Sequence, residues 1–171
     1  MKIFYTILLA ALLSLSNYSC YDVKSDEHKS PESIESLTTP HIEYDSLLAQ
    51  KLGADEYGMK KYVMAFLKMG PNAAKMEDAQ LQLQMAHLKN IIRMADEGKL
   101  AVAGPFMDDG DIKGIYIFNT ESLDTAMAWT STDPAVIAGR FVMELHPWYG
   151  SAAMLEVNQL HKRLEKKSIL N

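Results

Sequence analysis

The sequence has almost no cysteine, since Cys20 is the only one among 171 residues. A single cysteine excludes a disulfide bond within the chain and a zinc site built from cysteines. The sequence also has no excess of basic charge, because its formal net charge is -5. Residues 21–56 hold nine acidic side chains and three lysines, whereas residues 57–171 hold thirteen side chains of each sign. Because residues 57–171 carry no net charge, their electrostatics give no reason to expect a nucleic-acid partner.

Long apolar runs are also scarce, and the longest one lies close to the N-terminus. Residues 3–15 form an almost unbroken apolar run behind a short basic start. A membrane-spanning helix needs about twenty such residues, so this run is too short to span and has the shape of a secretory signal.

The segment that follows this run, LSNYSC, ends at Cys20 and resembles a lipobox, the signal of bacterial lipoproteins. Ser19 fits that pattern, while Asn17 stands where an aliphatic residue is usual. We predict a lipoprotein signal peptide over residues 1–20 and a lipid anchor on Cys20, on the periplasmic or outer side of a bacterial cell envelope. The alternative is an ordinary secretory signal that leaves Cys20 as a free thiol.

Composition divides the remaining chain into three parts. Residues 21–57 are rich in serine and acidic residues and lack a sustained apolar period, which predicts a polar acidic tether. A short helix over residues 42–52 is compatible with this segment. Residues 58–150 carry the apolar patterns of a folded domain, and residues 151–171 predict a polar C-terminal tail with a surface helix.

Strands and helices alternate in the folded domain. Apolar runs predict strands at residues 61–69, 100–106, 112–119 and 140–148, the last ended by Pro147. Amphipathic patterns predict a helix from about Met76 to a stop at Gly98, and another over residues 121–130 capped by Thr120 or Asn119. This order predicts an α+β, ferredoxin-like βαββαβ fold, with a four-stranded antiparallel sheet and two helices on one face.

The sheet face away from the helices has nothing predicted to cover it. Parts of residues 62–67 and 115–118 are apolar on both faces of their strands. Because an exposed apolar face of this size needs a partner, we predict a homodimer in which two sheets pair face to face.

The helix that contains His87 offers the best candidate for a reactive group. Its apolar residues recur at helical spacing and form one stripe: Leu81, Met85, Leu88, Ile92 and Ala95. At about 100° per residue, His87 lies about 120° from the middle of that stripe, at the border of the core. A free histidine has a pKa of about 6.5, which suits proton transfer near neutral pH.

Several short segments, in the same order along the chain, resemble the YCII-related family of the dimeric α/β-barrel superfamily. They cover about residues 62–150 and read YVMAFLKMGP, AHLKNI, GKLAVAGPF with the turn DDG, GIYIFN, TDPAVIAGRF and ELHPWYG. The resemblance implies a dimeric α/β barrel with a His-Asp pair in its cleft, here His87 and Asp133. Family members with known chemistry act on ring compounds, such as a dehydrochlorinase of chlorinated hydroxyquinols.

The resemblance implies an acid-base enzyme of the lyase, isomerase or dehalogenase type, acting on a small cyclic or enolisable compound. Asp133 would fix the tautomer of His87, and the other ring nitrogen would move a proton. Residues expected to contact the ligand are Gly104, Pro105, Phe106, His146 and Trp148. His146 stands where the family pattern has an arginine, which puts anion binding at that position in doubt.

Structural roles account for the same residues. An aspartate before proline is a common helix start, so Asp133 can be a helix cap, and His87 can be a packed boundary residue. His146 and Glu144 alternate on one strand and can form a structural pair. The protein would then be a non-catalytic small-molecule-binding or structural dimer module tethered to the membrane.

We predict no cofactor and no metal. The acidic turn at residues 108–111 lacks the spacing and the closing glutamate of a calcium-binding EF-hand loop. Ten methionines lie between Met59 and Met154, but no His-Met spacing indicates heme, and methionine commonly fills irregular cores.

Overall fold

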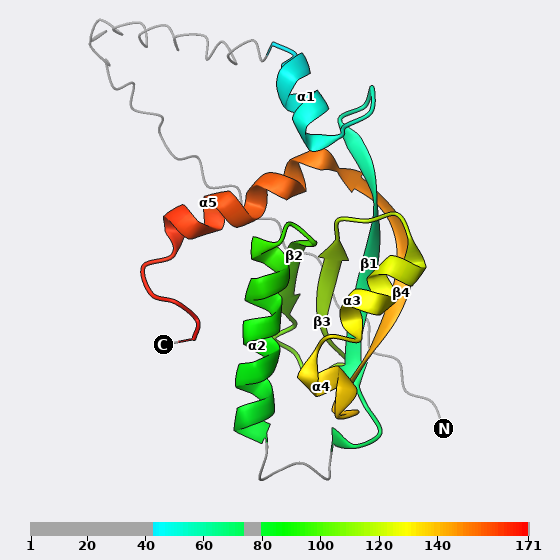
Figure 1. Ribbon diagram of the computed structural model, residues 1–171, viewed down its shortest axis with the longest axis vertical. Coiled ribbons are helices and arrows are strands. Elements are labelled where there is room, and N and C mark those ends of the chain that lie inside the picture. Colours follow the sequence, from blue (N-terminus) through cyan, green and yellow to red (C-terminus); the bar gives the residue numbers. More distant parts are fainter. Residues whose placement is uncertain (1–42, 74–79, 171) are drawn as a thin grey trace, which may run out of the picture. The chain divides into compact units, whose positions relative to one another are not determined.

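The computed structural model describes residues 43–73 and 80–170. The signal peptide, Cys20 and most of the predicted tether lie outside the described residues, as does the predicted helix start near Met76. The elements in chain order are α1 (Ser46–Leu52), β1 (Met59–Met69), α2 (Gln80–Asp96), β2 (Leu100–Pro105), β3 (Ile112–Phe118), α3 (Leu123–Thr130), α4 (Pro134–Ile137), β4 (Phe141–Ser151), the 3-10 helix η2 (Ala152–Glu156) and α5 (Val157–Leu164) (Figure 1). Among the helices of these residues, none combines the length and the apolar character that crossing a membrane requires.

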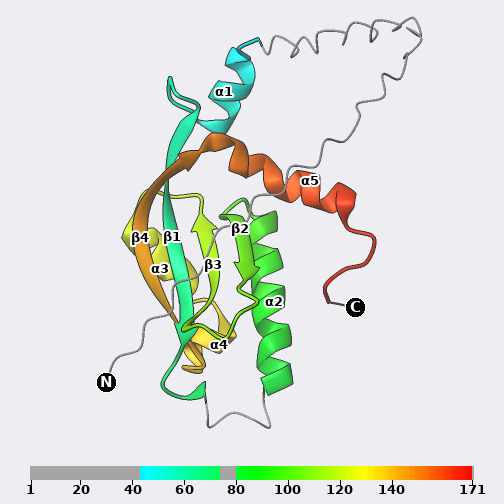
Figure 2. The same ribbon diagram turned by 180° about the vertical axis from the view of Figure 1, so that it is seen from behind.

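The four strands form one sheet in the order β2-β3-β1-β4, and every neighbouring pair is antiparallel. Helices α2 and α3 lie on one face of this sheet (Figure 1), and Figure 2 shows the strands from the opposite side. This arrangement confirms the predicted α+β, ferredoxin-like βαββαβ fold.

The main core lies between the sheet and the two helices. Side chains alternate between the faces of a strand, so every second residue of β1 and β3 points toward the helices. The buried cluster on this face consists of Val63, Ala65, Met94, Leu100, Tyr116, Phe118 and Ala126. Burying these side chains holds α2 and α3 against β1 and β3 and positions the polar residues between them.

The opposite face of the sheet is partly covered by the protein's own C-terminal segment. Tyr62 and Ile117 are buried there against Met154 and Leu155, which η2 supplies. Farther along the same face, β1, β3 and β4 leave apolar side chains half-buried or exposed: Met64, Phe66, Ile115 and Val142. The face that we predicted to be uncovered is therefore open over only part of its length.

The compact unit extends beyond residues 58–150 in both directions, because it begins at Glu43 and continues past β4 to the C-terminal end. Helix α1, within the predicted tether, buries Leu52 and pairs Lys51 with Glu156 at 2.9 Å. Beyond β4, the Asn158 side chain donates a hydrogen bond to the Leu100 carbonyl at 2.7 Å. Parts of the predicted tether and of the predicted tail thus pack against the folded domain.

Two element boundaries differ from the sequence predictions. Strand β4 continues past Pro147 to Ser151, which is tolerated because β4 is an edge strand and a proline there need not donate to a neighbour. Helix α3 is capped by Ser122, whose hydroxyl accepts from the Thr125 amide at 3.1 Å, rather than by Thr120 or Asn119.

Candidate active site

Helix α2 turns a partly polar face toward the sheet. Its buried residues are His87, Asn90 and Met94, spaced three and four residues apart on one side of the helix. Leu81, the first residue of the predicted apolar stripe, is instead 75% exposed. The predicted apolar stripe is therefore not the side of α2 that faces the core. That side carries His87 and Asn90, which are hydrogen-bonded, so the apolar residues alone predict the wrong orientation of the helix about its axis.

The remaining part of that stripe lines a cavity. Leu88, Ile92 and Ala95 form one wall of a space of about 640 Å³ between α2, β2, β3 and the C-terminal segment. Val157 of α5 also lines it. This volume suits a small organic ligand, and most of the wall is apolar, as is usual for such sites.

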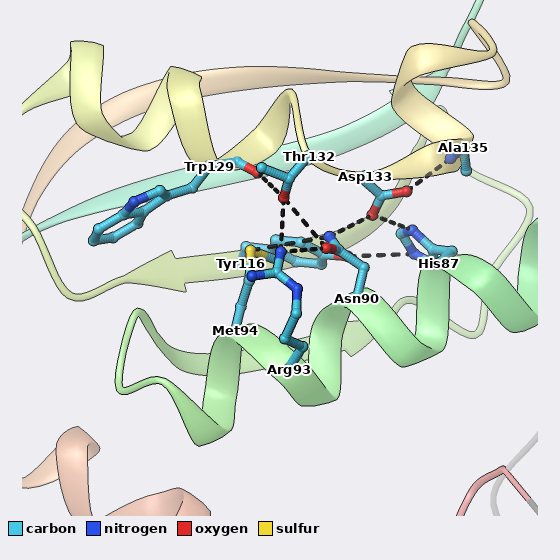
Figure 3. Close-up of polar contacts among 9 residues, drawn as sticks. All are labelled: His87, Asn90, Arg93, Met94, Tyr116, Trp129, Thr132, Asp133 and Ala135. Carbon is cyan, nitrogen blue, oxygen red and sulfur yellow. Dashed lines mark hydrogen bonds and ion pairs between the residues drawn. The ribbon is translucent and has the colours of Figure 1, made fainter.

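Asp133 serves the helix and the histidine with different oxygens. It is completely buried, and its Oδ1 accepts a hydrogen bond from the Ala135 amide at 2.8 Å, which caps α4. Its Oδ2 lies 2.7 Å from His87 Nδ1 (Figure 3). The helix cap and the pairing with His87, two roles of Asp133 that the sequence allowed together, therefore both occur.

This pairing determines which nitrogen of His87 is available. A carboxylate only accepts hydrogen bonds, so in the neutral imidazole the proton is on His87 Nδ1 and Nε2 carries the lone pair. The Tyr116 hydroxyl lies 3.3 Å from Nε2. Burial, and then the charge of Asp133, raise the pKa of Tyr116 above its usual range, so the hydroxyl keeps its proton and donates to Nε2. Both His87 and Tyr116 line the cavity, where a ligand can replace this long contact.

Asn90 supports the pair from the next turn of α2. Its Nδ2 donates to Asp133 Oδ2 at 3.4 Å, and its Oδ1 accepts from Arg93 at 2.7 Å (Figure 3). The arginine contact orients the amide so that its NH₂ group faces Asp133. Sequence reasoning missed Asn90, although a polar residue three positions after a candidate histidine on the same helix face is a usable signal.

The predicted ligand contacts divide between two places. Gly104 and Pro105, at the end of β2, line the cavity with His87. The cavity wall does not include Phe106, His146 or Trp148.

His146 and Trp148 belong to the other sheet face because alternation on β4 sends their side chains there. His146 Nε2 lies 2.9 Å from Glu144, and the His146 ring packs edge-on against Phe66. Trp148 packs against Tyr62 with 6.0 Å between ring centres. The cavity gives no support for ligand contacts by these two residues, and the pairing of His146 with Glu144 matches its alternative, structural role.

Within residues 43–73 and 80–170, no three side chains of histidine, cysteine, aspartate or glutamate are grouped as metal ligands. The residues that line this cavity offer hydrogen bonding, charge and proton transfer, the last of these at His87.

Comparison with known proteins gives two curated relatives and one solved structure. Protein YciI of Escherichia coli O6:H1 and Protein YciI of Shigella flexneri are each 32% identical to this chain over 84 residues, covering 44% of this chain and 86% of each relative. A solved structure, 5-chloro-2-hydroxyhydroquinone dehydrochlorinase from Burkholderia phenoliruptrix AC1100 in complex with 2,5-dihydroxybenzoquinone, is 21% identical with a TM-score of 0.37, covering 52% of this chain and 93% of that one.

The model of the YCII-related domain matches residues 62–149, which span β1 to β4 and include both His87 and Asp133. The chain belongs to the YCII-related domain family.

Proposed function

We propose that the protein is an acid-base enzyme of the lyase, isomerase or dehalogenase type, acting on a small cyclic or enolisable compound. One observation carries this proposal: a fully buried carboxylate, Asp133, holds Nδ1 of His87 at 2.7 Å while the histidine lines a cavity of small-molecule size. This is the arrangement of a base whose orientation and tautomer are set by a second group.

In the proposed reaction, His87 Nε2 takes a proton from a carbon next to a carbonyl or enol group of the ligand. Asp133 stabilises the imidazolium that forms, because its charge lies against the protonated Nδ1. The electron pair of the broken C–H bond becomes an enolate. The imidazolium then returns the proton to another atom in an isomerisation. In an elimination the enolate instead expels the leaving group with its bonding electron pair, and the imidazolium gives its proton to that group or to water.

A screen of small lactones, quinols and enols against the full-length protein tests this proposal. Thermal shift identifies compounds that bind, and turnover is then followed for each of them. The expected result is a compound that is converted by the wild type and not by His87→Ala. Conversion that is equally fast in both proteins would contradict the proposal.

The second candidate is a non-catalytic small-molecule-binding module. It is favoured by the cavity wall, which is mostly apolar. Compounds that stabilise the wild type but not His87→Ala, and that are never converted, would support this function over catalysis.

We also propose that the open part of the sheet pairs with a second copy of the chain. The supporting observation is the patch of half-buried or exposed apolar side chains on this face, of which Val142 is 43% exposed. Changing Phe66 to Asp would place a charge in its middle, so we expect a dimer in the wild type and a monomer in the variant. Light scattering after size-exclusion chromatography measures the mass, with Leu81→Asp on α2 as a control that stays dimeric. A wild-type monomer would contradict this pairing.

A lipid anchor on Cys20 is proposed from the lipobox-like segment alone, since Cys20 lies outside the described residues. More than one acyl chain would hold the protein stably at the bacterial membrane. We expect the wild type in the membrane fraction with the added mass of its acyl chains. A soluble wild-type protein with an unmodified thiol would indicate the ordinary secretory signal. Cys20→Ser is the control that lacks the acceptor.

A further inference from the structure

We propose that the His87 cavity accepts an organic anion and that Arg140 binds its negatively charged oxygens. This inference rests on the proposed function, because it names the class of ligand for the same cavity. The residue that it adds is Arg140, which is distinct from His87 and Asp133.

Arg140 is held firmly at the junction between α4 and β4. Its backbone amide donates to the Ala135 carbonyl at 2.9 Å, and its own carbonyl accepts from the Gly70 amide at 2.7 Å. Both contacts anchor the backbone of Arg140, one to α4 and one to the residue after β1. The side chain therefore starts from a well-defined point, which limits the cost of ordering it around a ligand.

The Arg140 side chain is buried, and the described residues place no opposite charge against it. The residue is 8% exposed, and its Nε has no hydrogen-bond partner among the described residues. No ion pair of the guanidinium is present in residues 43–73 and 80–170. A buried, unpaired charge is costly, and buried polar groups in proteins are nearly always satisfied. An anion in the cavity would supply the missing partner.

The described wall of the cavity offers an anion no negatively charged neighbour. Lys113 and His161 line it together with Arg140, and none of its described lining residues is acidic. The Lys113 ammonium already donates to the Gly110 carbonyl at 2.7 Å, and His161 lies 3.9 Å from Glu165. Arg140 is thus the cation of this wall that is both buried and without such a contact in the described part of the chain.

Arg140 and His87 lie close enough to act on one molecule. The guanidinium carbon of Arg140 and the ring centre of His87 are each 5.2 Å from the centre of the Phe141 ring. These two distances put the guanidinium carbon and the His87 ring centre at most about 10 Å apart, and both residues line the cavity, so a ring compound with a charged substituent can reach both of them. The planar guanidinium matches two oxygens of a carboxylate, or of adjacent phenolate and hydroxyl groups.

Benzoate and benzamide test this inference, because they have nearly the same shape and differ in charge. Their affinities for the full-length wild type and for Arg140→Met are measured by titration calorimetry. Hydrogen bonds to a charged group contribute enough to predict that the wild type prefers benzoate by about tenfold or more. In Arg140→Met we expect this preference to fall to about onefold, while Lys113→Met, the matched control, keeps it.

Arg140→Lys is measured beside these variants and should keep part of the preference, because it retains the charge but not the planar fork. Thermal unfolding without ligand checks each variant, and Arg140→Met should be as stable as the wild type, since it removes an uncompensated charge. If Arg140→Met fails to fold, Arg140→Lys decides, since an undiminished preference there would contradict recognition by the fork.

Equal affinities in the wild type, no binding of benzoate, or an unchanged preference in Arg140→Met would overturn the inference. None of these outcomes affects the acid-base proposal, which depends on conversion that requires His87. Conversely, benzoate binding through Arg140 would stand even if no compound were converted.

Discussion

Changing Asp133 to Ala is expected to lower the free energy of unfolding by about 3 kcal/mol or more, because a lost helix cap costs about 1 kcal/mol and each buried N–H group left without an acceptor costs about 1–3 kcal/mol. The substitution removes the cap of α4 and leaves the His87 Nδ1–H group and one Asn90 N–H without a buried acceptor. A domain of ordinary stability has about 5–15 kcal/mol in total, so this loss would be readily visible in urea unfolding.

The matched control is Ser122→Ala, which removes the cap of α3 at an exposed position. Loss of a cap alone costs about 1 kcal/mol. The difference between the two variants measures what Asp133 contributes through His87 and Asn90. A loss in Asp133→Ala no larger than that in Ser122→Ala would mean that Asp133 acts only as a helix cap.

The second large effect is expected on catalysis. For any compound that the wild type converts, we expect His87→Gln to lower kcat/KM by about 10²- to 10⁴-fold, the usual contribution of a positioned base. The amide of glutamine keeps a polar group in the site but cannot take up a proton at neutral pH. Steady-state kinetics should place most of the loss in kcat, because the cavity wall that binds the ligand is otherwise unchanged.

Asp133→Asn gives an independent check on the same mechanism. Its amide oxygen can still cap α4, while its NH₂ group would face Nδ1 of His87 and favour the tautomer with the proton on Nε2. We therefore expect a modest loss of stability and a loss of activity close to that of His87→Gln. Activity retained in both variants would exclude His87 as the base and leave small-molecule binding as the function.

Local sequence patterns were sufficient for the fold. Apolar residues on both faces of β1 and β3, glycines and prolines between the runs, and the strand-helix-strand order led to the four-stranded sheet that the structure shows. The Asp133-Pro134 pair likewise predicts the start of α4, because the cap and the first helical residue are neighbours in the chain. These features depend on interactions within a few residues, which a sequence displays directly.

The rotation of α2 and the course of both chain ends depended on distant contacts. His87 and Asn90 face the core because Asp133, more than forty residues away, offers acceptors that make their burial favourable. The position of helix α1 also depends on a distant residue, because its Lys51 pairs with Glu156. Pro147 is tolerated within β4 only because that strand lies at the edge of the sheet, which the local sequence does not reveal.

For this protein, the sequence alone determined the order of the elements and the sheet, and its resemblance to the YCII-related family predicted His87 and Asp133 as a pair. Only the tertiary structure decided that Asp133 uses one oxygen for each of its roles, that Asn90 and Tyr116 complete the surroundings of His87, and that Arg140 lies buried beside the same cavity. The physical reason is range: periodicity and capping act between near neighbours, whereas a buried polar side chain is stable only where folding brings its partners.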